Sequence, residues 1–339
     1  MRINRIDNLK GIGILLIVLG HCGLPLGNPL TKYLFSFHVA LFFIVSGFLF
    51  SEDKHTDFTK FFKNKFLRLV VPFFFFNIIF FAINKLLGEF SGTSIRDFLV
   101  GVLYGDYLGD KGGYINNTGG FNISNVSTWF LPALFVTSIY FFVINKMIQS
   151  KEMKIFSVIV ISLLVYIESK FTNFRFPWGL EIGLMVMLFY AFGNIFKKQI
   201  KKFADKIDYR YILFLIIVFG IHILFVNPTN ISTNDYGNYA FFLLDALLGF
   251  ITFLIISKLI GENKILSFFG KNSIIILGFE WIKILIQKNI FFLSFGLLSY
   301  ERSYLFGFTQ FFLTILFLVP IIFIVNKFFP FILGMSYKK

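Results

Sequence analysis

The chain has 339 residues, of which 57% are hydrophobic and only 15% are charged. Soluble proteins carry about 25% charged residues, and the mean hydropathy of this chain is +0.78. This composition excludes an ordinary soluble enzyme and predicts an integral membrane protein with several membrane-spanning helices. The formal net charge of +14 does not indicate nucleic-acid binding, because the basic residues fall in alternate loops between apolar segments. The single cysteine excludes an intrachain disulfide and a cysteine-based metal cluster.

About ten apolar segments have a length close to the ~20 residues that a helix needs to cross a bilayer. The sequence therefore predicts an all-α bundle of about ten transmembrane helices. We expect one membrane-embedded domain over residues 1–339 and no soluble domain. The expected spans lie near residues 9–27, 33–50, 67–87, 128–148, 154–169, 178–196, 211–226, 239–260, 272–292 and 304–329.

Lys and Arg are concentrated in the connections after the second, fourth, sixth and eighth spans and in the last residues of the chain. These connections share one side of the membrane with the N-terminus if there are ten spans. The opposite connections hold few basic residues. By the positive-inside rule, both termini are predicted to be cytoplasmic. On the opposite side, residues 94–104 are expected to form a short interfacial helix.

Lys10 and His21 lie on the first predicted span with ten residues between them. Eleven helical positions make about three turns, so the two side chains should share one face, roughly 16 Å apart along the axis. Asp7 falls on the same broad stripe. An ionisable side chain inside a membrane helix is costly and usually functional. A cation at the cytoplasmic end and an imidazole deep in the bilayer, on one face, predict a site for a long anionic ligand with a reactive end.

His38 on the second span has the same predicted depth as His21, about 18 Å from the cytoplasmic side. Two imidazoles at one depth on antiparallel neighbouring helices would share a cavity. The alternative is that each histidine only bonds a nearby backbone carbonyl or serine. Arg68, at the inner end of the third span, would bind a phosphate or would act only as a positive-inside anchor. The other ionisable residues inside spans are Glu181, His222, Asp245, Glu280 and Lys283. Glu181 is discussed below, and the roles of the other residues stay open.

Several of these landmarks resemble the integral-membrane acyltransferase family 3. Residues 5–11 (Arg-Ile-Asp-Asn-Leu-Lys-Gly) and 18–21 (Val-Leu-Gly-His) resemble its opening motif, a basic residue and a histidine separated by ten residues. Residues 37–50, with Phe-Phe-x-x-Ser-Gly-Phe, are similar to its second helix. Residues 66–72 resemble the basic segment that follows, and residues 128–131 (Thr-Trp-Phe-Leu) and 270–273 (Gly-Lys-Asn-Ser) resemble later landmarks.

The resemblance implies transfer of an acyl group, usually acetyl from acetyl-CoA, to a hydroxyl of a glycan or small molecule. It implies His21 as general base, with His38 or Glu181 as catalytic partners and with no metal and no permanently bound cofactor. The donor acyl-CoA would bind on the cytoplasmic side, and the acceptor would be a sugar or glycan, which a lipid could carry. The expected location is the plasma membrane of a bacterial cell. The residues implied to bind the donor are Asp7, Lys10, Ser46, Gly47, Arg68 and Trp129.

The chain also departs from the family pattern at three places. Lys10 stands where arginine is common, and Glu181 stands where aspartate is more usual. Ile276 and Glu280 occur in a helix that often carries tyrosine and histidine. The segment around residues 129–131, with Pro177, Trp178 and Glu181, resembles the subset related to fucose 4-O-acetylases. These departures leave the acceptor, the acyl chain length and the role of the ninth span open.

Two other function classes fit parts of the same sequence. A secondary transporter or flippase for a sugar or lipid-linked sugar would also use buried histidines and carboxylates, although the sequence lacks the internal repeat that many transporters show. A non-catalytic assembly subunit with satisfied buried polar groups is the third reading. Glycan-assembly genes next to the coding gene would favour the enzyme over both alternatives.

The charge alternation generates a direct test of topology. Reporter fusions placed after Ser51, Ser150 and Lys202 should all report a cytoplasmic location, because each follows a predicted even-numbered span. Alkaline phosphatase and fluorescent-protein fusions at the same positions provide opposite readouts. An external signal at any of the three sites would contradict the ten-span arrangement.

Overall fold

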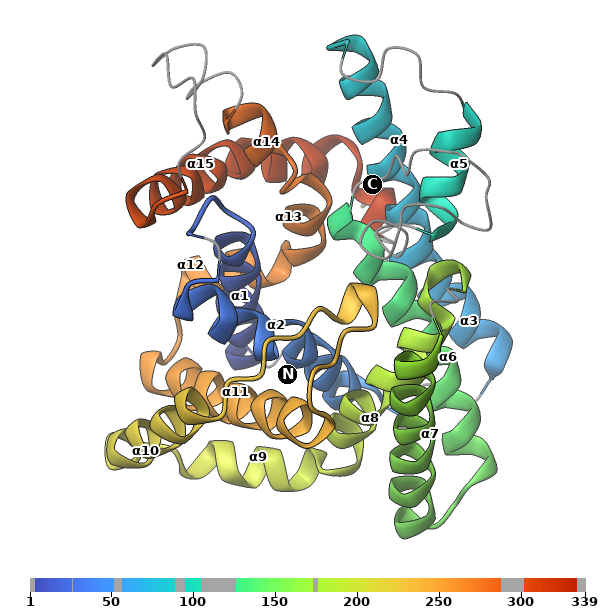
Figure 1. Ribbon diagram of the computed structural model, residues 1–339, viewed down its shortest axis with the longest axis vertical. Coiled ribbons are helices and arrows are strands. Elements are labelled where there is room, and N and C mark those ends of the chain that lie inside the picture. Colours follow the sequence, from blue (N-terminus) through green and yellow to red (C-terminus); the bar gives the residue numbers. More distant parts are fainter. Residues whose placement is uncertain are drawn as a thin grey trace. The chain divides into compact units, whose positions relative to one another are not determined.

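The computed structural model describes residues 4–25, 27–51, 57–88, 95–104, 126–172, 176–287 and 302–333 (Figure 1). Within these ranges the regular structure is helical and no β-strand is present; the one β-type pairing is an isolated antiparallel bridge between Asn230 and Asp235. The prediction of an all-α protein is therefore confirmed. Residues 105–125, which connect the third and fourth predicted spans, lie outside the described residues.

Six helices in the described part of the chain are long and apolar enough to cross a membrane. The third of the predicted spans forms the end of a longer helix that begins at Phe58 and includes a π-helical turn. The six are α2 (Pro29–Leu49), the continuous α3–η2–α4 helix (Phe58–Lys65, Phe66–Val70, Val71–Leu86), η4–α6 (Val126–Trp129, Phe130–Met147), η5–α8 (Pro177–Gly179, Leu180–Ile195), α11 (Tyr239–Ile260) and α15 (Tyr304–Phe328).

Helices also lie at the other four predicted spans, but they are shorter or more charged than the six. The count of ten spans and the cytoplasmic location of the termini stay predictions. These helices are α1 (Asn4–Gly20), α7 (Lys151–Phe171), α10 (Tyr211–Leu224) and the pair α13 (Ser273–Phe279) and α14 (Ile282–Ile286). The connections contain α5 (Ile95–Tyr104), which was expected as an interfacial helix, together with α9 (Lys197–Lys206), α12 (Lys264–Lys271) and the 3-10 turns η6 (Ile231–Thr233) and η8 (Pro330–Leu333).

The first compact unit comprises Met1–Val45, Phe196–Thr229 and Tyr236–Phe328. Its most extensive helix pair is α1 with α12, and this pair depends on two glycines. A Cβ at Gly11 would overlap the carbonyl oxygen of Leu266, and a Cβ at Gly270 would overlap the carbonyl oxygen of Asp7. Small residues that allow such close backbone contact commonly hold helices together in membranes. Burial of apolar surface contributes little to helix association there, because the lipid chains are themselves apolar.

The second compact unit comprises Ser46–Ile195, Asn230–Asp235 and Phe329–Lys339. Helix α8 packs against both α6 and α7, and Gly183 of α8 fits closely against Val136 of α6. Aromatic rings fill the interior; for example, Phe61 and Phe142 stack with ring centroids 4.7 Å apart. The many phenylalanines of the sequence therefore act as packing residues here.

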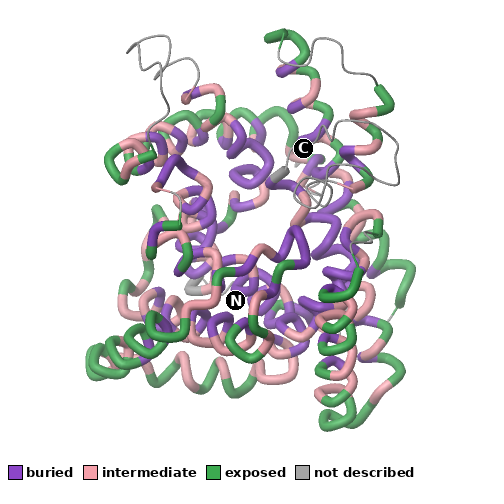
Figure 2. Tube along the Cα trace, in the orientation of Figure 1, coloured by how far each residue is buried: buried purple, intermediate pink, exposed green. Residues whose placement is uncertain are grey.

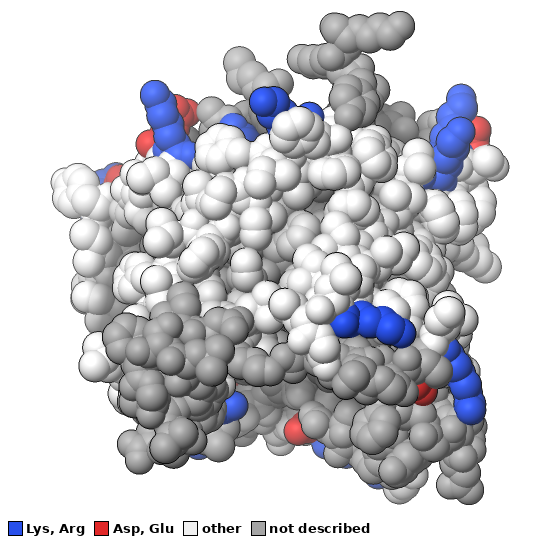
Figure 3. Space-filling model, turned by 90° about the horizontal axis from the view of Figure 1, so that it is seen from above, with Lys and Arg blue, Asp and Glu red and all other residues white. Residues whose placement is uncertain are grey.

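The exterior of the helices is strongly apolar. Helix α10 is largely exposed along its length (Figure 2), and its Leu213 side chain is 68% exposed. Leu305 on α15 is 82% exposed. On the face in Figure 3, the few visible Lys and Arg side chains leave a wide uncharged area. Such a surface suits contact with lipid chains, in agreement with an integral membrane protein.

The first helix differs from its prediction. It ends at Gly20 and does not continue to residue 27. The following residues turn back, with the Cys22 amide bonded to the Leu19 carbonyl at 3.1 Å and the Leu24 amide to the Cys22 carbonyl at 2.7 Å. Pro25 then ends the turn, since proline has no N–H to continue a helix. His21 consequently lies at the end of α1 rather than within a longer span.

The close contact of α1 with α12 predicts the effect of a single methyl group. Gly11→Ala should destabilise the protein by about 1–3 kcal/mol or more, because the added Cβ has no room beside the Leu266 carbonyl. Thermal unfolding in detergent, followed by size-exclusion chromatography, measures the change. Gly220→Ala in α10 is the matched control, because nothing lies within 4 Å of its Cβ position. Equal melting temperatures for Gly11→Ala and the unchanged protein would contradict the packing role.

Candidate functional site

His21 is held by a carboxylate from the other end of the sequence. Its Nδ1 atom lies 2.9 Å from Oε1 of Glu280, and the two residues are 259 positions apart. The Glu280 side chain is fully buried, whereas 29% of the His21 side chain is exposed. The imidazole is therefore fixed on one side and accessible on the other.

Glu280 lies at a break between two helices. α13 ends at Phe279 and α14 begins at Ile282, and short-range bonds from the Lys283 amide to the Glu280 carbonyl (3.2 Å) replace the regular helical pattern. The Lys283 ammonium group approaches the same carboxylate oxygen, Oε1, at 3.1 Å. A buried carboxylate requires such a counter-charge. Glu280 and Lys283 thus form an ion pair on which the His21 ring is anchored.

This arrangement decides which ring nitrogen of His21 can act as a base. An ionised carboxylate only accepts hydrogen bonds, so Nδ1 of His21 carries the proton that it donates to Glu280. The other nitrogen, Nε2, then has a lone pair. A histidine with one nitrogen held by a carboxylate and the other available is the arrangement of a general base.

His38 lies next to this pair. Its ring centroid is 6.2 Å from that of His21, and the Phe35 ring contacts both, with centroids 5.6 Å from His21 and 4.9 Å from His38. The structure thus brings the two predicted histidines together. His38 is only 2% exposed, and its Nδ1 bonds the carbonyl oxygen of Leu34 in the same helix. His38 therefore makes the hydrogen bond to a nearby backbone carbonyl that was the alternative to a functional role.

The other site residues predicted on α1 lie far from its end. Lys10 and Asp7 are half-buried, about three turns before Gly20 or further. Their location beside α12 follows from the close contact of the two helices.

The remaining predicted site residues belong to the second unit. Arg68 is exposed and lies in the π-helix η2; π-helical turns are rare and occur frequently at functional sites. Gly47 fits against the Tyr190 carbonyl of α8, where a Cβ would overlap, so this part of the Ser-Gly-Phe motif has a packing role. Trp129 lies in η4, and Ser46 precedes Gly47 on α2.

Glu181 is the second residue of α8, and an unusual turn precedes this helix. Trp178 has a φ of 58°, in the left-handed region that non-glycine residues seldom adopt. The Glu181 side chain is 5% exposed, and its Oε2 accepts a hydrogen bond of 3.3 Å from the Phe176 amide. A strained residue next to a buried carboxylate is an arrangement found at functional sites. Glu181 and Arg68 are both placed in unit 2, and His21 in unit 1.

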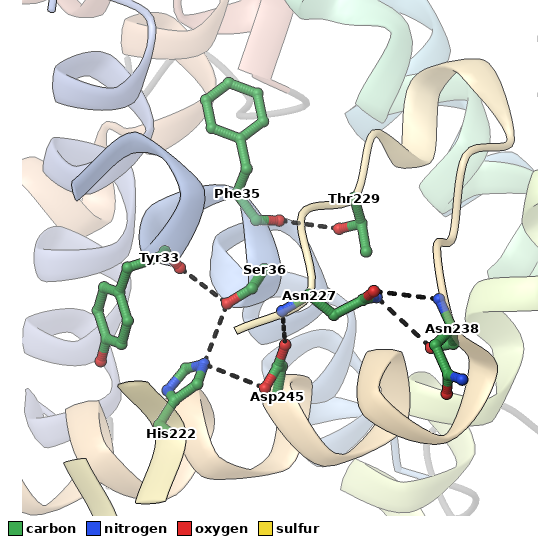
Figure 4. Close-up of polar contacts among 8 residues, drawn as sticks. All are labelled: Tyr33, Phe35, Ser36, His222, Asn227, Thr229, Asn238 and Asp245. Atoms are coloured by element: carbon green, nitrogen blue, oxygen red, sulfur yellow. Dashed lines mark hydrogen bonds and ion pairs between the residues drawn. The ribbon is translucent and has the colours of Figure 1, made fainter. Parts of the chain in front are cut away.

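A second buried cluster joins Ser36, His222 and Asp245 (Figure 4). Nε2 of His222 lies 3.0 Å from Ser36 Oγ and 3.7 Å from Asp245 Oδ1. A catalytic Ser-His-Asp triad uses both ring nitrogens, one for the serine and one for the aspartate. Here both partners approach the same nitrogen, so the cluster lacks the geometry of such a relay.

The second cluster instead attaches the segment after α10 to its neighbours. The Asn227 amide donates to Asp245 Oδ2 at 2.7 Å, and Thr229 Oγ1 donates to the Phe35 carbonyl at 3.0 Å. Both bonds are drawn in Figure 4. The cluster therefore stabilises the first turns of α2, the helix that presents Phe35 and His38 to His21.

Two residues of the site were not singled out from sequence. Glu280 was one of the ionisable residues inside spans whose roles stayed open, and nothing in the sequence pointed to a contact with His21. Gln310 is a buried amide in an apolar span, and it bonds both chain segments of the site. The available signal was a polar side chain in an otherwise apolar segment.

Comparison with known proteins gives one match. A family model described as an acyltransferase domain matches residues 3–333. No curated protein and no solved structure matches the chain.

Proposed function

Because the chain belongs to the acyltransferase family 3, we propose that it transfers an acyl group from acyl-CoA to a hydroxyl of a sugar or cell-surface glycan. Membership of this family supports acyl transfer at a membrane. Our proposal adds acetyl-CoA as the donor, a glycan as the acceptor and His21 as the base. The observation that carries it is the hydrogen bond of 2.9 Å from His21 to the buried Glu280.

The reaction follows from the position of the available nitrogen. Nε2 of His21 takes the proton of the acceptor hydroxyl while the hydroxyl oxygen attacks the thioester carbonyl carbon. The tetrahedral intermediate then collapses, the carbon–sulfur bond breaks, and the CoA sulfur receives the proton back from Nε2. Glu280 holds the ring and stabilises the imidazolium that forms between the two proton transfers, a role that a carboxylate serves in other histidine-based sites.

His38 and Glu181 keep their proposed catalytic roles as supporting groups. His38 is buried against Phe35 beside the His21 ring, so its proposed role is to limit the positions that this ring can adopt. For Glu181 the proposed role is binding of an acceptor hydroxyl by its carboxylate. Its buried position at the start of α8 supports a fixed orientation for such a contact.

The proposed donor carries several phosphates, which require cations. Arg68 is exposed and offers a planar set of donors suited to phosphate. Lys10 is the basic member of the opening family motif. Their positive charge supports Arg68 and Lys10 as phosphate ligands, and the family motifs alone support Asp7, Ser46, Gly47 and Trp129 as further donor contacts.

The central prediction concerns His21. His21→Asn should reduce acyl transfer by purified protein roughly 10²–10⁴-fold, because asparagine is polar but cannot take up a proton near neutral pH. Glu280→Gln should cause a smaller loss, since the amide can still contact the ring but does not balance Lys283. Transfer of radiolabelled acetyl from acetyl-CoA to a glycan acceptor measures both.

His222→Asn is the matched control for this experiment. It makes the same change at another buried histidine, which is bonded to Ser36 and lies outside the His21–Glu280 pair. Folded His222→Asn protein should lose far less turnover than His21→Asn, because His222 acts on His21 only through the position of α2. Transfer by His21→Asn at the unchanged rate would remove His21 as the base. A transporter would show no acetyl transfer in the unchanged protein, but would move a sugar across vesicles.

The donor contacts have a separate test. Arg68→Gln and Lys10→Gln should each weaken acetyl-CoA binding more than they slow turnover at saturation, because they remove only a phosphate contact. Isothermal titration with CoA and the ratio of KM to kcat give the two effects. Lys60→Gln is the control, because Lys60 is an exposed cation of the same continuous helix, Phe58–Leu86. Unchanged CoA affinity in both variants would leave these residues as topology anchors.

A further inference from the structure

Gln310 connects the two broken segments that carry the site. It lies on α15 and is 2% exposed. Its Oε1 accepts a hydrogen bond of 2.7 Å from the Gly23 amide, two residues after His21. Its Nε2 donates a hydrogen bond of 2.9 Å to the carbonyl oxygen of Lys283, three residues after Glu280. One side chain is thus bonded to both segments.

Both bonded groups lie next to a helix interruption. Gly23 follows the end of α1, and Lys283 is the second residue of the short α14, which begins after the break at Glu280. The Lys283 carbonyl also accepts the Gln287 amide, and its second lone pair accepts the Gln310 amide. Within a membrane, a non-helical N–H such as that of Gly23 is tolerated only when a protein group satisfies it. Gln310 supplies an acceptor to one segment and a donor to the other, which a neutral amide can do and a carboxylate cannot.

One turn before Gln310, a glycine of α15 allows the turn after His21 to lie close to this helix. At Gly307, a Cβ would lie 2.9 Å from the Leu24 nitrogen and 2.6 Å from its Cδ2 atom. Glycine therefore allows the turn after His21 to approach α15 closely. The two features, the amide of Gln310 and the missing side chain of Gly307, act on the same short turn.

We propose that Gln310 is a positioning residue for the acyl-transfer reaction. It holds the turn after α1 against the α13–α14 break, so that His21 stays on Glu280 with its Nε2 facing the reactants. The catalytic part of this inference rests on the proposed function. The structural part does not, because it concerns only how two segments are held together.

The chain contains its own reporter for the structural part. Cys22 is the single cysteine of the sequence; it is 4% exposed and lies in the turn between His21 and Gly23. In the unchanged full-length protein in detergent, its thiol should react slowly with N-ethylmaleimide. Release of the turn exposes the thiol, and mass spectrometry of the intact protein measures the labelling rate.

Gln310→Met removes the hydrogen bonds to Gly23, Lys283 and Gln287 while preserving approximate size. We expect labelling of Cys22 at least about tenfold faster, from the loss of the bonds to Gly23 and Lys283. We also expect at least about tenfold lower kcat with an unchanged KM for acetyl-CoA. Gln310→Glu keeps an acceptor for Gly23 but loses the donor to Lys283, so its effect should have the same direction. Thr309→Val, the neighbouring residue that bonds only its own helix at Leu305, is the control and should change neither quantity.

Gly307→Ala provides an independent variant if Gln310→Met does not fold. The added methyl group pushes on Leu24, so Cys22 labelling should again be faster. Labelling and kcat at the unchanged rates in Gln310→Glu and Gly307→Ala would overturn the inference. Faster labelling with unchanged kcat would overturn its catalytic part. Absence of transfer in the unchanged protein would instead contradict the proposed function, while the labelling rates still test the structural part.

Discussion

One oxygen atom, Oε1 of Glu280, accepts hydrogen bonds from both His21 and Lys283. A buried carboxylate needs a counter-charge and hydrogen-bond donors, since the membrane interior supplies neither. Lys283 meets the first need from the next helical turn, and His21 meets the second from the opposite end of the chain. The end of α1 must therefore lie beside the α13–α14 break. The arrangement of the first unit around His21 depends on this requirement.

Three of the residues with proposed chemical roles occur where regular helices are interrupted. His21 follows the last turn of α1, Glu280 separates α13 from α14, and Arg68 lies in a π-helical turn. An interruption frees backbone groups and changes the direction of a side chain, but it requires compensating partners inside a membrane. Gln310 supplies such partners to two of the segments. The Ser36–His222–Asp245 cluster likewise stabilises the start of α2, which gives the buried His222 a structural role.

Much of this arrangement is encoded in short stretches of sequence. Apolar length predicted the positions of the helices, because a bilayer of nearly constant thickness requires about 20 apolar residues per span. The rarity of ionisable groups in such spans singled out His21 and His38, whose rings the structure places together. Other details are less visible. The span predicted to continue to residue 27 ends at Gly20, and Gly47, predicted as a donor contact, also has a packing role against α8.

Composition, the period of apolar segments and the opening motif by themselves determined an all-helical membrane protein, its family and the two histidines. These features depend on neighbouring residues and on the solvent, both of which can be read along the chain. Only the tertiary structure decided which of several buried carboxylates forms the hydrogen bond with His21. Glu181, Asp245 and Glu280 all lie in apolar segments, and Asp245 contacts His222 instead. The choice depends on which helices pack together, and that is decided by contacts such as those of Gly11 and Gly307, between residues far apart in the sequence.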